Sequence, residues 1–263
     1  MGVVNLTSDS FSDGGMWLAP EAALAHARRL IADGADILDL GAESTRPGAA
    51  PVAAETEIAR LVPLVRALRA KTDLPISIDT MKPQVARACV AAGATLWNDV
   101  TALRHAPDSL ATAAELGCEV VLMHMQGEPA TMQQAPQYAD VVAEVADVLA
   151  ERAAAAVAAG VARERIWLDP GIGFGKHPTR HNLPLLAGLD RIVALGFPVL
   201  LGASRKQFIA ALDRDAPPDQ RLGGSIAAAL AGVAAGVAAV RVHDVRETVQ
   251  AVRAWEAIAA ARG

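Results

Sequence analysis

The chain is poor in cysteine and in aromatic residues, and both scarcities narrow its class. Cys89 and Cys118 are the only cysteines among 263 residues, too few for the disulfide framework of a small secreted domain. A reducing, cytoplasmic location is therefore expected. Phe, Trp and Tyr make up only 3% of the chain although 52% of it is hydrophobic, so alanine and aliphatic side chains do most of the packing.

Long apolar runs and an excess of positive charge are also missing. The most membrane-like stretch, residues 225–240, is shorter than a bilayer span and consists largely of Ala and Gly. The chain shows no basic region followed by an apolar one, so no signal peptide is expected. The net charge of −5 provides no basic field for nucleic acid. We expect neither a membrane partner nor a nucleic-acid partner.

Glycines recur along the chain at the spacing of one strand and one helix. They are Gly34, Gly93, Gly117, Gly160, Gly196 and Gly236, and an apolar run follows each within a few residues. Because glycine accepts the left-handed conformation that ends helices, the recurrence indicates repeated strand–helix units. No linker or low-complexity tract interrupts them, so one domain over residues 1–263 is expected.

The apolar runs predict eight strands. We place them at residues 2–6, 36–40, 75–79, 95–99, 119–124, 165–169, 198–202 and 238–242, with helices at 20–33, 54–70, 83–93 and 244–260 among those that follow. Pro20 and Pro83 suit the first turns of their helices. The predicted fold is α/β, a single (β/α)8 TIM barrel. An open doubly wound sheet is the alternative, but no GxGxxG turn follows the first strand.

Polar residues lie where the expected strands end. They are Asn5, Asp79, Asn98, His124, Asp169, Ser204 and His243. In a parallel barrel these strand ends meet at one mouth, which is where such barrels carry active sites. Asp79, Asn98 and Asp169 would offer carboxylate and amide groups to a flat heterocycle with adjacent N–H donors. The alternative is that each of the three caps the helix that follows it.

Two segments rich in turn-forming residues, 7–19 and 41–52, follow the first two expected strands. Both should rise over the mouth and act as lids. The first begins after Asn5 and contains Asp13, although Asn, Ser, Asp and Gly also make ordinary turns. In the second, Arg46 precedes Pro47, and its guanidinium could hold a carboxylate or phosphate or simply be solvated.

The segment from Asp169 to Lys176, DPGIGFGK, is rich in glycine but lacks the GK[ST] ending of a phosphate loop. Nucleoside triphosphate binding is therefore not expected. The glycines would let a ligand approach the backbone, with Phe174 as an aromatic wall. His124, beside two methionines, is more typical of a hydrogen-bonded core residue than of a ligand.

Cationic residues gather near the last two expected strands. Ser204-Arg205-Lys206 would begin a helix whose N-terminus attracts anions. Arg241 and His243 are two residues apart on the last strand, so both can face one side. Barrels often bind phosphate after strands seven and eight, which favours an anion site over a pair of structural cations.

These segments together resemble dihydropteroate synthase. The matching stretches are NLTSDSFSDGG, GAESTRPGA, ISIDT, WNDV, LMHMQGEPATMQ, LDPGIGFGK, GASRK and RVHDV, which run in the family's order over nearly the whole chain. The resemblance implies a TIM barrel that forms homodimers and acts as a transferase of folate biosynthesis, the target of sulfonamides. The enzyme would join 6-hydroxymethyl-7,8-dihydropterin pyrophosphate to p-aminobenzoate by dissociative substitution and release pyrophosphate.

The resemblance also implies roles for single residues. The pterin would be bound by Asp79, Asn98, Asp169, Lys206 and Arg241, and the pyrophosphate by Asn5, Arg241 and His243. Mg2+ would be the cofactor, bridged to Asn5. The p-aminobenzoate pocket would comprise Thr45, Arg46, Pro47, Phe174 and Lys206. Asp13, Arg46 and Lys206 would act in catalysis, with Asp13 supporting the developing cation.

Two positions of this chain differ from the usual family sequence, and two other functions are alternatives to the one that the resemblance implies. Ser8 replaces the usual proline, and Gln207 stands where many members have a small hydroxyl or a basic residue. A pterin-binding barrel that transfers methyl groups would lack the STRPG and SRK segments that this chain has. A non-catalytic paralogue would bind pterin without releasing pyrophosphate.

Overall fold

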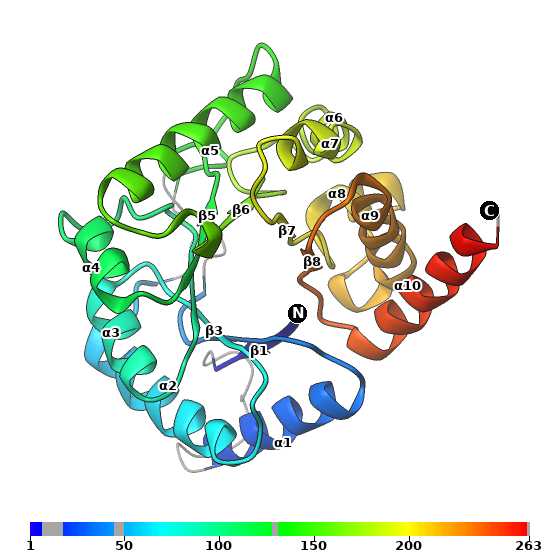
Figure 1. Cartoon of the computed structure of the whole chain (residues 1–263). Coiled ribbons are helices and arrows are strands. Elements are labelled where there is room, and N and C mark those ends of the chain that lie inside the picture. Colours follow the sequence, from blue (N-terminus) through cyan, green and yellow to red (C-terminus); the bar gives the residue numbers. More distant parts are fainter. Residues whose placement is uncertain (7–17, 45–49, 128–130, 262–263) are drawn as a thin grey trace.

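The computed structural model describes residues 1–6, 18–44, 50–127 and 131–261. Parallel strands form a ring with helices outside it, and the N-terminus lies near the middle of the ring in the view of Figure 1. The strands are β1 (Gly2–Asn5), β2 (Leu38–Gly41), β3 (Ile76–Asp79), β4 (Leu96–Asp99), β5 (Glu119–Met123), β6 (Ile166–Asp169), β7 (Leu200–Leu201) and β8 (Ala239–Val240).

Helices follow the strands in alternation. They are α1 (Leu18–Ala32), α2 (Ala54–Arg69), α3 (Pro83–Ala91), α4 (Ser109–Leu116), α5 (Val141–Ala158), α6 (Asn182–Ala187), α7 (Leu189–Val193), α8 (Gln207–Leu212), α9 (Leu222–Ala235) and α10 (Val245–Ala260), with short 3-10 turns at Arg163–Arg165 and Pro218–Gln220. Pro20 and Pro83 both fall in first turns, as expected. The expected helix bounds are correct to within two residues.

Hydrogen bonds between first and last strands close the ring. Strands β1 to β6 pair in sequence order, and β7 pairs with β8. Single bridges between Leu168 and Val199 and between Gly2 and Val242 join the two sheets. The Val3 N–H donates to the Val242 carbonyl at 3.1 Å, and the Val242 N–H donates to the Met1 carbonyl at 2.9 Å. The expected (β/α)8 barrel is therefore confirmed, and the doubly wound alternative is wrong.

The last two strands are shorter than predicted. Regular pairing covers Leu200–Leu201 and Ala239–Val240 rather than residues 198–202 and 238–242. Pro198 has no N–H to donate to a ladder, which limits the start of β7. Beyond β8, the Arg241 N–H still donates to the Leu201 carbonyl at 2.9 Å. The chain thus keeps its register up to the residue that enters the mouth.

The barrel interior has an apolar layer with a polar layer above it. Met1, Leu96, Val121 and Leu200 form a buried cluster, against which Ile37, Trp167 and Ala239 pack. Because alternate residues of a strand face the same side, the next inward residues lie two positions further along each strand. These are Val3, Asp39, Asn98, Met123, Asp169, Gly202 and Arg241, and four of the seven are polar. The apolar layer therefore forms a floor on which polar groups from distant strands stand together.

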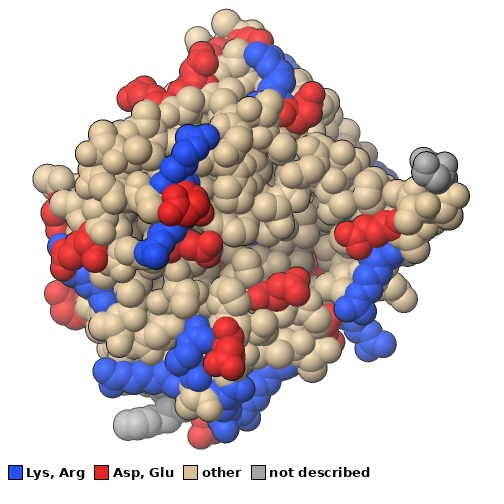
Figure 2. Space-filling view, viewed as in Figure 1, with Lys and Arg blue, Asp and Glu red and all other residues tan. Residues whose placement is uncertain are grey.

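The outer surface matches the composition. On the face in Figure 2, residues of both charge signs are interspersed, mostly toward the outer edge, without an extended area of one sign. Such a face lacks the single-sign field that favours nucleic acid. Among the helices of the described residues, none combines the length and the apolar character needed to cross a bilayer.

Candidate active site

An arginine from the end of the chain lies between two carboxylates from its beginning. The Arg241 Nε donates to Asp39 Oδ2 at 2.6 Å, and one terminal nitrogen donates to Asp79 Oδ2 at 2.9 Å. Asp39 is fully buried and Asp79 is 13% exposed, whereas 21% of the Arg241 side chain is exposed. The guanidinium is therefore anchored from below and open toward the mouth.

Asp39 also binds side chains from β3 and β4. It accepts a hydrogen bond from the Ser77 hydroxyl at 2.6 Å and a long one from the Asn98 amide at 3.5 Å. We call Asp39, Asp79, Asn98 and Arg241 the arginine network. It brings together three residues expected at the site, Asp79, Asn98 and Arg241, and adds one that was missed.

Asp39 had a signal in the sequence. It interrupts the apolar run DILDL, and a carboxylate inside a buried strand requires a cation or several donors. Asp39 lies inside the expected strand 36–40 rather than at its end, so the pattern of polar residues at strand ends does not include it.

The second part of the site surrounds Gly202. A Cβ atom at this position would lie 3.7 Å from Asp169 Oδ2, 3.8 Å from Lys206 Nζ and 4.0 Å from Arg241 Cβ. The missing side chain leaves space in which Asp169 and Lys206 approach the arginine network. The other oxygen of Asp169, Oδ1, accepts the Gly171 N–H at 2.7 Å, which fixes the carboxylate plane.

Lys206 and Phe174 lie against each other beside this space. The Lys206 ammonium is 4.6 Å from the centroid of the Phe174 ring and donates to the Ile172 carbonyl. Such a cation over an aromatic face is attracted by the ring's electrons. Phe174 is half-buried, so its ring can also present an apolar surface to a ligand. The structure thus places Asp169, Lys206 and Phe174 together, as expected.

Asn5 and His243 line a hollow of about 320 Å3 between β1 and α1, together with Arg205 and His26. The Asn5 side chain is exposed, and the His243 Nδ1 lies 3.0 Å from the Ser204 hydroxyl. Arg205 is paired with Asp244 through both carboxylate oxygens. Two of the expected anion-binding residues therefore share one cavity with an additional, carboxylate-bound arginine.

A larger hollow, about 590 Å3, lies elsewhere and contains none of the expected site residues. Tyr138, His177 and His181 are among the residues that line it. One ring nitrogen of each histidine accepts backbone N–H groups, from Thr179 and Arg180 for His177 and from His177 for His181. We therefore place the chemistry at the barrel mouth rather than in this hollow.

The ionisation of the mouth depends on burial and on the arginine. Burial raises the pKa of Asp79 to about 7, although the nearby Arg241 charge opposes the rise. Burial also raises the pKa of Asp169, against the influence of Lys206. Burial lowers the pKa of Lys206 to about 8. For Arg241 burial would lower the pKa, but Asp39 and Asp79 outweigh it, so the guanidinium stays charged.

His124 is a core residue, as its surroundings in the sequence indicated. It is buried, and its Nδ1 lies 2.8 Å from the Nζ of Lys176. Lys176 also donates to the carbonyls of Gly171 at 3.0 Å and Phe174 at 3.1 Å. Burial and the Lys176 charge lower the pKa of His124 to about 3, so the ring is neutral at physiological pH. Lys176 and His124 support the glycine-rich loop from below.

Three expectations drawn from the sequence differ from the structure. The helix after Ser204-Arg205-Lys206 begins only at Gln207 and has six residues, so these cations do not form its first turn. The glycines at 171 and 175 allow close approach to the backbone of His124 and Gln126, not to a ligand, since a Cβ there would overlap those carbonyls. Asp79, Asn98 and Asp169 occupy no helix N-cap, so the capping alternative is wrong.

Asp99, the neighbour of Asn98, instead stabilises the turn that follows β4. One of its oxygens accepts the Thr101 N–H and hydroxyl at 2.7 Å each, and the other accepts the Leu103 N–H at 3.0 Å. The remaining expected residues, Asp13, Thr45, Arg46 and Pro47, lie outside the described part of the chain.

The chain matches a known family over most of its length. The family described as "Pterin binding enzyme" matches residues 1–243. The dihydropteroate synthase of Escherichia coli K12 is 47% identical over 262 residues, covering 100% of this chain and 92% of that protein.

Two solved structures carry ligands related to the predicted reaction. A dihydropteroate synthase from Xanthomonas albilineans with 4-aminobenzoic acid is 51% identical, with a TM-score of 0.93 over 99% of this chain and 92% of that one. The Burkholderia cenocepacia enzyme complexed with 7,8-dihydropteroate is 46% identical, with a TM-score of 0.90 over 100% of this chain and 91% of that one.

We predict that Asp39→Asn destabilises the protein because the substitution removes a buried charge that Arg241 needs. The free energy of unfolding, measured by urea denaturation at pH 7.5, should fall by about 3 kcal/mol. Glu115→Gln is the control, since its ion pair with Arg87 is exposed and should contribute less than about 1 kcal/mol. Equal effects of the two substitutions would contradict the anchoring role of Asp39.

Proposed function

The chain belongs to the dihydropteroate synthase family, and we propose that its barrel mouth performs that reaction with the residues described above. The enzyme condenses 6-hydroxymethyl-7,8-dihydropterin pyrophosphate with p-aminobenzoate to give 7,8-dihydropteroate and pyrophosphate. The observation that carries the assignment is the convergence above one apolar floor of Asp79, Asn98, Asp169 and Arg241 from four strand ends and of Lys206 from the start of α8.

We propose that the pterin lies flat in the space above Gly202. Asp169 would accept the two parallel N–H bonds of the amino-amidine edge, because its plane is already fixed by Gly171. Asp79 and Asn98 would bind the remaining polar atoms of the rings, and Lys206 a ring acceptor. Arg241 would lie against the face of the ring, where a planar guanidinium stacks well.

The pyrophosphate would occupy the hollow beside Asn5 and His243. Arg241 is two residues before His243, which lines this hollow, so a turn of its side chain away from Asp79 would bring charge to the leaving group while Asp39 keeps its other edge. If the guanidinium turned toward the pyrophosphate, it would release Asp79 and make that carboxylate available to the pterin. One residue would then couple binding of the ring to binding of its leaving group.

We propose Mg2+ as the cofactor, held by Asn5 and by pyrophosphate oxygens. The described residues contain no group of three or more His, Cys, Asp or Glu able to hold a metal. A single exposed amide oxygen at a strand end fits an ion that keeps most of its waters and binds through substrate phosphates. When bound there, Mg2+ would neutralise charge on the leaving group.

The second substrate would bind beside Phe174 and Lys206, with Thr45, Arg46 and Pro47 completing the pocket. The Phe174 ring would pack on the aromatic ring of p-aminobenzoate. Arg46 would bind its carboxylate in a fork, and Lys206 would add a second positive charge. Asp13 would lie near the reacting methylene and stabilise positive charge there. Together Asp13, Arg46 and Lys206 form the proposed catalytic set.

We propose a dissociative substitution at the pterin methylene. The electron-rich dihydropterin spreads the positive charge that develops as pyrophosphate departs, and the surrounding carboxylates stabilise it. The aniline nitrogen can then attack without a strong base, so positioning and electrostatics supply most of the rate.

Oxygen-18 placed between the pterin methylene carbon and the first phosphorus of the substrate tests this order of events. We predict that, without p-aminobenzoate, the label scrambles into non-bridging positions of recovered substrate, because the departed pyrophosphate rotates before returning. Nuclear magnetic resonance of phosphorus would detect the isotope shift. Retention of the label in the bridge, with the enzyme shown to be active, would argue for concerted displacement.

The assignment itself is tested by pyrophosphate release. We predict release only when both p-aminobenzoate and Mg2+ are present, and a loss of about 100-fold or more in kcat/KM for Asp169→Asn. Asp99→Asn is the matched control, because it replaces another buried carboxylate at a strand end that holds only a turn. Pterin binding without any release by the unaltered protein would favour a non-catalytic paralogue, and methyl transfer would favour the other pterin-binding class.

The pH dependence follows from the two shifted groups. Asp79 must be ionised to accept pterin N–H groups, so kcat/KM should rise as pH rises through about 7. Lys206 must be protonated to donate, so kcat/KM should fall as pH rises through about 8. Lys206→Arg should weaken the alkaline fall because guanidinium remains charged. A flat profile between pH 6 and 9 would contradict these assignments.

We further propose a homodimer, a cytoplasmic location and a single domain over residues 1–263. Helix α9 carries no charged residue between Leu222 and Ala235, and Leu222, Ala227, Ala231 and Ala234 are exposed on it, which suits a second copy of the chain. The two cysteines are free and buried, as a reducing compartment would permit. Sedimentation equilibrium that gave only the 27.2 kDa mass would contradict the dimer.

A further inference from the structure

Glu43 lies where the chain leaves β2, and its carboxylate binds the chain where it returns toward α2. Its Oε1 accepts the Val52 N–H at 3.0 Å. Residues 44–51 therefore begin and end at a single carboxylate. Val52 lies just before the first turn of α2, so the same contact sets where this helix is entered.

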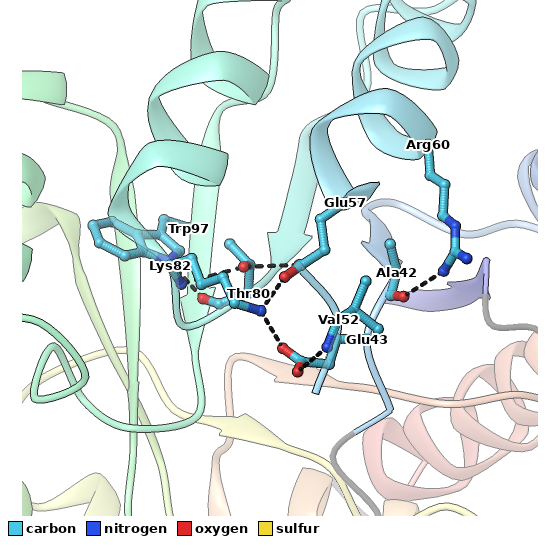
Figure 3. A network of polar contacts seen from close by, with 8 residues as sticks. All are labelled: Ala42, Glu43, Val52, Glu57, Arg60, Thr80, Lys82 and Trp97. Atoms are coloured by element: carbon cyan, nitrogen blue, oxygen red, sulfur yellow. Dashed lines mark hydrogen bonds and ion pairs between the residues drawn. The ribbon is translucent and has the colours of Figure 1, made fainter. Parts of the chain in front are cut away.

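Lys82 holds the other oxygen of that carboxylate. Its ammonium lies 2.6 Å from Glu43 Oε2 and also binds Glu57 Oε1. Figure 3 shows the ammonium between the two carboxylates, with Glu57 coming from α2 and Lys82 from the segment before α3. The three side chains are 13%, 9% and 0% exposed for Lys82, Glu43 and Glu57. We call these three residues the lysine clamp.

The lysine clamp is tied to the strands that carry the proposed pterin ligands. The Thr80 hydroxyl donates to Glu57 Oε2 at 3.0 Å, and the Trp97 indole N–H donates to the Thr80 carbonyl at 2.7 Å. Thr80 follows Asp79, and Trp97 precedes Asn98. The contacts drawn in Figure 3 therefore connect the ends of β3 and β4 with the carboxylate from which residues 44–51 depart.

The charge balance distinguishes this arrangement from an ordinary structural ion pair. Burial raises the pKa of Glu57 in spite of Lys82, so a single lysine already serves a costly buried carboxylate. The Lys82–Glu57 pair alone would give the buried carboxylate the counter-charge that stability requires. A second carboxylate on the same ammonium adds negative charge to a sparsely solvated site, and that carboxylate belongs to the chain segment entering residues 44–51.

We propose that Lys82 is a positioning residue for p-aminobenzoate: by holding Glu43, it sets both ends of the segment that contains Thr45, Arg46 and Pro47. The inference rests on the proposed function, in which these three residues contact p-aminobenzoate. Lys82 itself touches no substrate. Its effect is transmitted through Glu43 and the Val52 N–H.

Lys82→Met should raise the KM for p-aminobenzoate about tenfold, because small displacements of positioning groups are costly. The KM for the pterin pyrophosphate, measured at saturating p-aminobenzoate, should change less than about twofold. Arg69→Met is the matched control. Arg69 is a partly buried cation at the end of α2, and it donates to the carbonyls of Thr72, Leu74 and Gly93 at 3.0 to 3.1 Å. The Arg69→Met substitution should lower the melting temperature without altering either KM.

A double substitution separates positioning from stability. Lys82→Met leaves Glu57 buried without its cation, so the melting temperature should fall. Lys82→Met with Glu57→Gln removes the more deeply buried of the two carboxylates that lose their cation, so the melting temperature should recover in large part while the KM for p-aminobenzoate stays raised. If that KM returned to its original value together with the melting temperature, the role of Lys82 would be structural only and the proposal would fail.

Glu43→Gln provides the test if Lys82→Met does not fold. This variant keeps the Lys82–Glu57 pair and an oxygen for the Val52 N–H, but loses the charge that Lys82 holds. The KM for p-aminobenzoate should rise about threefold or more, and an unchanged value would overturn the proposal. Turnover by the unaltered chain keeps the two hypotheses apart: its absence would contradict the proposed function, whereas normal turnover with unchanged variants would contradict only the positioning role.

Discussion

The ion pairs of Arg241 with Asp39 and Asp79 are the contacts on which the geometry of the mouth depends. They join residues separated by 202 and 162 positions in the chain, so they form only when the last strand has closed against the first ones. The apolar floor below them excludes water and makes each unpaired charge costly. The charges can lie there because both carboxylates of the arginine network share the guanidinium and Asp39 accepts hydrogen bonds from Ser77 and Asn98 as well. Closure of the barrel and assembly of the site are therefore one event.

The same contacts suit a site that must receive both a polar ring and a charged leaving group. Asp39 is fully buried and Asp79 is not, so the two carboxylates holding Arg241 are unequal. A ligand can replace the more accessible partner while the buried one keeps the guanidinium in place. Burial raises the pKa of Asp79 to about 7 against the influence of Arg241, so a ligand that replaces the guanidinium must supply donors that keep this carboxylate ionised. A preorganised site of this kind needs little rearrangement when charge develops.

The periodic part of the structure could be predicted from the sequence, and the pairing of distant charges could not. Recurring glycines and apolar runs located every strand, and amphipathic patterns located the four helices that were given bounds, because those signals are local. The short β7 and β8 were overestimated, since the loss of regular pairing there depends on how the ring closes rather than on propensity. Polar residues at strand ends were found by their position. Asp39 was missed because its role follows from Arg241, and no local pattern connects the two.

Three lysines show why residue type alone is a weak guide to function in such a barrel. Lys176 is fully buried and binds carbonyls and His124, Lys82 binds two carboxylates beneath a chain segment, and Lys206 stands over Phe174 beside Asp169. Sequence motifs suggested a ligand-binding role for Lys206, left Lys176 without one and said nothing of Lys82. What differs is the set of acceptors that folding places around each ammonium. A lysine satisfied by backbone carbonyls has no capacity left for substrate, whereas one shared between carboxylates from two elements fixes those elements relative to each other.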